Sequence, residues 1–258
     1  MVSRIAAAAV LGLALALPLP AYAQTEVLET GLARDYDTGA LLYRELHVLR
    51  RTGDGSPQER LVLYRCEDGT AFARKRVDYR GSPKAPSFNF EDVRSGFSEG
   101  VVRGASASEV FVRRPGAERL QAPLPAGALV ADAGFDQWVR ASWPQLVAGE
   151  RVPMRFLVPS RLASYDFKVY EVEVGNGQRR FRLRLGGLLG WFVPYIDVVY
   201  AEADRRLLRF EGLSNLRDDA GDDNLKVRID FPTPPTPAAA GEWARFAAEP
   251  LRACRVGA

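Results

Sequence analysis

The stretch WFVPYIDVVYAEADRRLLRFEGLSNLRDDAGDDNLKVRIDF, residues 191–231, decides the fold. Runs rich in β-branched and aromatic residues occupy 196–200, 206–212 and 225–231, and clusters of Gly, Asp and Asn separate them. Such a pattern is typical of short antiparallel strands joined by tight turns. We therefore expect a three-stranded meander here, within a chain that repeats the pattern almost throughout.

Upstream of this meander the same pattern predicts further strands. In the strand at 179–185, apolar Phe181, Leu183 and Leu185 alternate with arginines, so one face is buried and the other is wet. Residues 115–127 contain three prolines and are expected to be irregular. The other expected strands lie at 26–35, 41–51, 60–66, 71–79, 87–94, 97–103, 109–113, 152–158 and 165–174.

Residues 132–149 form the one clearly predicted helix before the C-terminal linker. Phe135, Trp138, Val139 and Ser142 recur at helical spacing, Trp143 extends the apolar face, and Asp132 is placed to cap the first turn. Pro144 is expected to begin a second short turn that Gly149 ends. After a Pro/Ala linker, residues 241–255 predict a terminal helix with Trp243, Phe246 and Leu251 as its apolar contacts.

These elements predict a mainly β protein: a strongly curved antiparallel sheet, an open or closed barrel, with one internal helix and a short C-terminal helix. Roughly ten strands in one sheet tend to curl rather than stay flat. We expect residues 24–231 to form a single domain, with the linker and C-terminal helix of residues 232–258 docked on it.

Residues 1–23 have the features of a signal peptide. Arg4 supplies the positive charge, residues 5–19 are apolar, and Ala21-Tyr22-Ala23 forms a cleavage site. The apolar run is shorter than the roughly 20 residues that span a bilayer, and no later stretch reaches that length, so no transmembrane segment is expected. The predicted location is the periplasm, with secretion beyond the cell as the alternative.

Cys66 and Cys254 are the only cysteines, and an oxidising compartment favours their pairing. Such a bridge would close a loop of 188 residues and, in the chain-entropy description, stabilise the fold by on the order of 5 kcal/mol.

Composition and motifs exclude several functions. The net charge of +3 does not suggest a partner nucleic acid. The basic residues of the chain are almost all arginine, which reflects either codon usage or a surface that binds phosphates and anionic headgroups. No nucleotide-binding loop or G-x-S-x-G motif occurs. With one histidine, and an Asp-rich loop at 218–224 that does not match a calcium loop, we expect no metal and no cofactor.

His47 and Glu45 share one face of the strand at 41–51. A carboxylate beside an imidazole can tune proton transfer, although a hydrogen-bonded pair on a sheet face is much commoner. We expect no catalytic role here.

Aromatic residues gather near the helix and the strands that should meet it. They either fill the core or line an apolar cavity between sheet and helix, where curved barrels hold ligands. The candidate ligand-binding residues are Phe88, Phe90, Trp138, Trp143, Trp191, Phe192 and Tyr195.

The order of the predicted elements over residues 131–231 resembles that of known proteins. Phe135, Trp143, Leu146 and Gly149 mark a helix that ends in an aromatic–Leu–Gly segment, and a strand–turn–strand unit carries Asp197, Tyr200, Asp204, Arg206 and Leu207. This order resembles periplasmic proteobacterial proteins of unknown function and the open-barrel lipid carriers of the LolA/LolB type. The resemblance implies a barrel-like ligand binder, although the chain lacks the lipidated cysteine of such carriers.

The resulting expectation is a non-enzymatic periplasmic binding or carrier protein for an apolar or amphipathic, lipid-like ligand. The alternative is a structural or interaction protein of the cell envelope that has a filled core and binds other envelope proteins.

Overall fold

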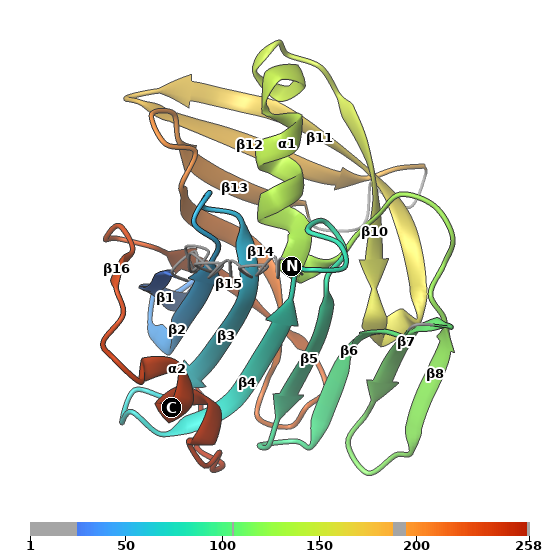
Figure 1. The fold of residues 1–258 in the computed structure, drawn as a ribbon, viewed down its shortest axis with the longest axis vertical. Coiled ribbons are helices and arrows are strands. Elements are labelled where there is room, and N and C mark those ends of the chain that lie inside the picture. The colour runs from blue at the N-terminus through green and yellow to red at the C-terminus, as the bar shows by residue number, and fades with distance from the viewer. Residues whose placement is uncertain (1–24, 105, 188–194, 257–258) are drawn as a thin grey trace, which may run out of the picture.

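The computed structural model describes residues 25–104, 106–187 and 195–256, so the predicted signal peptide lies outside the described residues. One sheet runs through the molecule (Figure 1). Its first half consists of β1 (Thr25–Asp35), β2 (Leu41–Arg51), β3 (Pro57–Arg65), β4 (Ala71–Asp78), β5 (Ser87–Asp92), β6 (Phe97–Arg103), β7 (Ser108–Arg113) and β8 (Arg119–Pro123). Its second half consists of β9 (Leu129–Val130), β10 (Val152–Val158), β11 (Ala163–Gly175), β12 (Gln178–Leu185), β13 (Ile196–Ala201), β14 (Leu207–Arg217), β15 (Asn224–Asp230) and β16 (Thr236–Pro237).

The sheet is two meanders joined at β1. Its order runs from β8 back to β1, continues with β15, and then runs back from β14 to β9. All neighbours are antiparallel except β9 and β10, which are parallel. The sheet curls but does not close, because β8 and β9 remain its two edges. The expected curved, mainly β architecture is confirmed, and the barrel is open.

The strand count and two boundaries differ from the sequence expectation. The sheet has 16 strands, three more than the ranges assigned from the sequence, because β8 and β9 add to its two edges and β16 pairs with β1. Residues 119–123, expected to be irregular, form β8 by pairing with β7, and Pro123 is tolerated there because β8 is an edge. Strand β14 continues to Arg217 because Leu216 is buried in the core.

Helix α1 (Phe135–Val147) follows a single 3₁₀ turn, η1 (Asp132–Gly134), and packs on the concave face of β10–β13. Trp138, Val139, Trp143 and Leu146 are its buried apolar residues. Two details differ from expectation. Asp132 makes no capping hydrogen bond, and Pro144 lies inside the helix rather than starting a new turn. Proline costs the helix one backbone hydrogen bond, and burial of Trp143 and Leu146 holds this last turn on the sheet.

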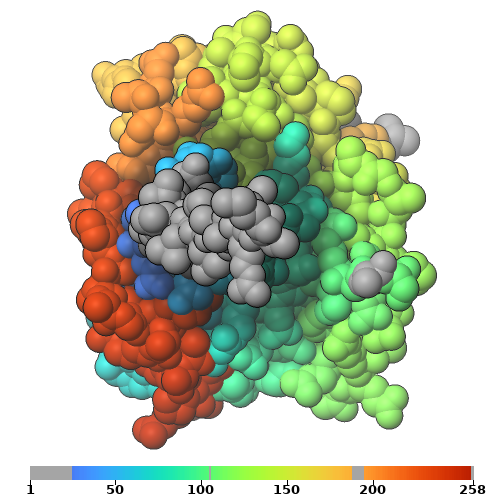
Figure 2. Space-filling model, in the orientation of Figure 1, coloured from blue at the N-terminus to red at the C-terminus, as the bar shows by residue number. Residues whose placement is uncertain are grey.

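The C-terminal segment covers the outer face of β2–β4 and is red in Figure 2. Helix α2 (Glu242–Ala248) places Phe246 against Val48, Leu61 and Leu63. It is shorter than the expected 241–255, because Pro250 holds the preceding residue in an extended conformation. The predicted disulfide between Cys66 and Cys254 is present, with Cα atoms 6.5 Å apart.

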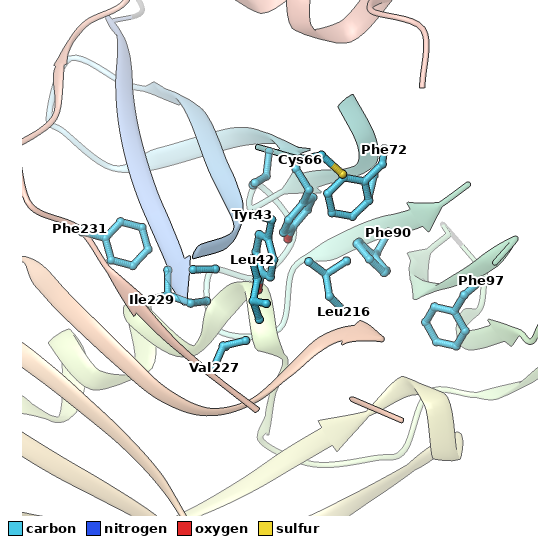
Figure 3. Close-up of a cluster of buried hydrophobic side chains, with 14 of the residues drawn as sticks. Leu42, Tyr43, Cys66, Phe72, Phe90, Phe97, Leu216, Val227, Ile229 and Phe231 are labelled. Atoms are coloured by element: carbon cyan, nitrogen blue, oxygen red, sulfur yellow. The ribbon is translucent and has the colours of Figure 1, made fainter. Parts of the chain in front are cut away.

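The core is built from the two halves of the sheet facing each other. In one cluster, Tyr43, Phe72 and Phe90 of the first half meet Leu216 and Ile229 of the second (Figure 3). On β12 the predicted alternation is confirmed: Phe181 and Leu183 are buried, whereas the intervening arginines lie on the outer face. There Arg182 donates to Asp197 on β13 at 2.8 Å.

In the described part of the chain, no helix combines the length and the apolar character needed to cross a bilayer.

Candidate functional site: an arginine-lined cavity beside His47

The predicted aromatic residues do not converge on one cavity. Phe90, Phe88 and the pair Trp138 and Trp143 belong to three different packed clusters, and all four are buried. Tyr195 is 47% exposed, and the Arg182 guanidinium lies 3.6 Å from its ring centre. Trp191 and Phe192 fall outside the described residues. The four buried residues therefore contribute to packing under the helix and between the strands.

A cavity of about 230 Å³ lies elsewhere, on the inner face of the first three strands. Strand β15 pairs with β1 only from Leu32 to Asp35, and the chain pairs with β1 again, as β16, at Val27 and Leu28. The gap between these two pairings leaves the space. We call this space the arginine cavity. Its lining residues are Val27, Glu29, His47, Leu49, Arg51, Arg60, Asp136, Arg140, Asp204, Arg206, Leu207, Phe231 and Pro235.

The strand register explains why these side chains meet. His47 on β2 lies opposite Glu29 on β1, and Leu49 lies opposite Arg60 on β3. Because side chains alternate between the two faces of a sheet, these residues all point inward. Helix α1 adds Asp136 and Arg140, and the β13–β14 turn adds Asp204 and Arg206.

Positive charge exceeds negative charge in the cavity. Of the four arginines, only Arg140 forms an ion pair with a carboxylate within the described residues, from its Nε to Asp136 at 2.9 Å. Arg51 and Arg206 instead donate to the backbone carbonyls of Gly55, at 3.1 Å, and Phe231, at 3.0 Å. Burial and repulsion from other guanidinium groups lower the pKa of Arg51. The cavity therefore holds cations that its own carboxylates do not neutralise.

Arg60 is the least satisfied of these cations. Its Nε is buried and has no hydrogen-bond partner, and its guanidinium lies 6.0 Å from the ring centre of Tyr79. Burial disfavours its charge, but the fields of Tyr79, Asp136 and Glu29 outweigh that effect and raise its pKa. Buried polar atoms in proteins are almost always hydrogen-bonded, so an unpaired guanidinium nitrogen on a residue that lines a cavity is an exception that calls for an explanation.

His47 is held rigidly and also has one unpaired nitrogen. Its Nε2 lies 2.9 Å from Glu45 Oε2, and its ring packs edge-on against Phe231 at 5.7 Å. Its Nδ1 is buried and has no partner. Gly31 makes the Phe231 contact possible, because a Cβ there would lie 2.9 Å from that ring. The pairing of Glu45 and His47, expected from the sequence, is thus present and lies beside the cavity.

A second group of charges connects strands β4 and β6 with η1, and two of its members, Lys75 and Glu99, are buried. Lys75 on β4 binds Asp132 of η1, and Glu99 on β6 is 6% exposed. Burial raises the pKa of the Glu99 carboxyl from its ordinary 4.5 to about 7, although the positive charge of Lys75 opposes the shift. Glu99 also accepts a hydrogen bond from the Ser160 backbone, next to which Arg114 binds the Ser160 carbonyl at 2.7 Å.

Glu99 predicts a specific pH dependence of stability. Below pH 4.5 the carboxyl is protonated in both the folded and the unfolded state, so it does not lower the free energy of unfolding. Between pH 4.5 and about 7 only the unfolded state ionises, so stability falls, by about 3 kcal/mol in all. Glu99→Gln removes this charge, and we expect the variant to be more stable than wild type above pH 7.

Urea unfolding at pH 5 and pH 8 measures the effect. Glu118→Gln is the matched control, because Glu118 is exposed and its substitution leaves the pH profile unchanged. A Glu99→Gln variant that keeps the wild-type loss of stability between the two pH values would contradict the argument.

No metal site is apparent in the described ranges, where no three His, Cys, Asp or Glu side chains are placed to hold an ion. In the Asp-rich loop, Asp219 accepts from Arg94 at 2.8 Å, and Asp218 accepts from the backbone of Asp222 at 2.9 Å. These carboxylates therefore stabilise the loop itself.

No protein-family model, curated protein or solved structure matches this chain. Sequence reasoning did not find the arginine cavity, whose residues come from six separate segments. The available signals were the preference for arginine over lysine and the inward face shared by Glu45 and His47.

Proposed function

We propose that the protein is a non-enzymatic binding protein that holds a small amphipathic ligand in the arginine cavity. The single observation that carries this proposal is the cavity's mixed lining, in which the buried His47 Nδ1 and Arg60 Nε lack partners. Small-molecule sites commonly combine an apolar wall with a few convergent polar groups. Here Val27, Leu49 and Leu207 belong to the apolar wall.

The size of the cavity limits the ligand. At about 230 Å³ it is smaller than the roughly 300–1,000 Å³ of typical small-molecule pockets. A whole diacyl lipid would not be enclosed. A compact amphipathic molecule, or one end of a longer one, fits the space better.

Native mass spectrometry of protein purified from its own cell envelope tests the proposal. We expect a retained small ligand, and we expect the emptied protein to take up the amphipathic dye anilinonaphthalene sulfonate. Leu207→Trp fills the cavity and should abolish dye uptake. Leu213→Trp, on the exposed face of the same strand, is the matched control and should leave uptake unchanged. A measured mass that shows no bound ligand, together with no dye uptake, argues against a binding function. Equal dye uptake by the two variants argues against it as well.

The second candidate is a structural or interaction protein of the cell envelope. The observation that favours it is the packing beneath α1, where Trp143, Phe181 and Tyr200 make edge-to-face and tilted contacts at 5.3–6.1 Å. That region is filled by the protein's own aromatic side chains. A bare mass combined with capture of a defined envelope protein by the purified chain would support this function instead.

We propose a periplasmic location on the strength of the N-terminal sequence pattern. Fractionation of the native cells should place the protein in the periplasmic extract, with residues 1–23 removed. Recovery of the uncleaved chain with the cytoplasm would overturn this assignment.

A further inference from the structure

We infer that the polar end of the ligand is an anion, a carboxylate or a phosphate monoester, bound by the arginines of the arginine cavity that form no ion pair, Arg60 foremost. The inference rests on the proposed function and names the chemical class of its ligand.

The first argument is charge. Four guanidinium groups face three carboxylates in the arginine cavity, and one of those carboxylates is already paired with Arg140. Arginine remains charged at any physiological pH, and burial together with repulsion from Arg60 and Arg140 makes the charge of Arg51 costly. An anion in the cavity offsets that cost, whereas a cationic ligand would add to it.

The second argument is the geometry of unsatisfied donors. Leu49 and Arg60 are cross-strand partners, and His47 is two residues from Leu49 on the same inner face. Arg60 and His47 are therefore diagonal neighbours, at the roughly 7–8 Å typical of such positions. Both residues line the cavity, and the Arg60 Nε has no hydrogen-bond partner within the described residues. A compact group with several acceptor oxygens can bind the rest of the Arg60 guanidinium.

The third argument is the tautomer of His47. Its Nε2 faces a Glu45 oxygen at 2.9 Å and so carries a hydrogen that it donates. Nδ1 is then an acceptor, so His47 borders the cavity without donating to the anion, and the guanidinium groups hold the head group.

Calorimetric titration with four six-carbon probes tests the inference on the full-length mature chain. Hexanoate and hexyl phosphate carry the two candidate anions, and hexan-1-ol and hexylammonium carry a neutral and a cationic end on the same tail. We expect at least one of the anions to bind about tenfold or more tightly than the alcohol, and no binding of the ammonium. The tighter of the two anions identifies the head group.

Variants assign the residues. Arg60→Met should weaken anion binding about 10- to 100-fold, and Arg206→Met provides a second test at a less buried position. Arg113→Met, on an exposed position of β7, is the matched control.

The outcomes separate the two proposals. If none of the four probes binds and the native protein is bare, the proposed function fails. If hexan-1-ol or hexylammonium binds as tightly as the anions, or Arg60→Met and Arg206→Met leave anion binding unchanged, a ligand site exists but the anion inference is overturned.

Discussion

Replacement of both Cys66 and Cys254 by serine should lower the free energy of unfolding by about 3–5 kcal/mol. The disulfide spans 188 residues and joins the end of β3 to the C-terminal segment. A loop that long restricts the unfolded chain strongly. The cross-link also holds α2, whose seven residues are too few to form a stable helix alone.

The contacts around α2 indicate which region loosens first. Phe246 is buried against β2 and β3, Arg65 binds Glu249 at 2.6 Å, and Arg50 lies 4.1 Å from the Trp243 ring centre. Without the cross-link the segment is held by these contacts and by backbone hydrogen bonds such as that from the Arg252 N–H to the Ala71 carbonyl, at 2.8 Å. We expect hydrogen exchange of Glu242–Ala248 to speed up, whereas β12 and β13, remote from the bridge, keep their protection.

Denaturant unfolding of the double serine variant measures the loss of stability. Wild type with its disulfide reduced is the control and should match the variant. A variant whose unfolding curve coincides with that of the oxidised wild type would show that packing alone secures the C-terminal segment.

Trp143→Ala is expected to cost about 3–5 kcal/mol of unfolding free energy, the range measured for large aromatic deletions in cores. Trp143 is 6% exposed. Its ring contacts Phe181 at 5.3 Å and Tyr200 at 6.0 Å, both edge-on, and the Arg205 guanidinium lies 5.4 Å away. Its removal leaves a cavity beneath α1 that these rigid neighbours cannot fill.

This substitution separates packing from ligand binding. Val174→Ala, at a position 54% exposed, is the control and should change stability by less than about 0.5 kcal/mol. Because Trp143 does not line the arginine cavity, hexanoate binding by the folded variant should match that of wild type. A Trp143→Ala protein of nearly wild-type stability that loses ligand would place the site under α1 instead.

Local patterns predicted much of the fold. The ranges 41–51, 97–103 and 152–158 were assigned as strands with the boundaries that the structure shows. The pattern of apolar and polar residues within each range is enough to predict a strand. The internal helix and the bridge between Cys66 and Cys254 were also predicted. Errors came where pairing overrides composition: β8 forms from a proline-containing segment because β7 offers it a partner.

The candidate site could not be predicted in the same way. Glu45 and His47 were paired correctly because they are two residues apart on one strand. Arg60 gave no signal, since it looks like an ordinary surface arginine within its own segment, and Arg206 was noted only as part of a strand–turn–strand unit. Only the curled sheet shows that they border one space with His47.

The sequence alone therefore determined the strand periodicity, the buried face of α1 and the pairing of the cysteines, all of which depend on short-range pattern or on a unique pair. Tertiary structure decided that the barrel stays open, that β1 pairs with β15, and that a gap before β16 becomes a cavity. These features depend on which distant strands meet and on how far the sheet twists. Both are set by the summed packing of the whole sheet, which no single segment encodes.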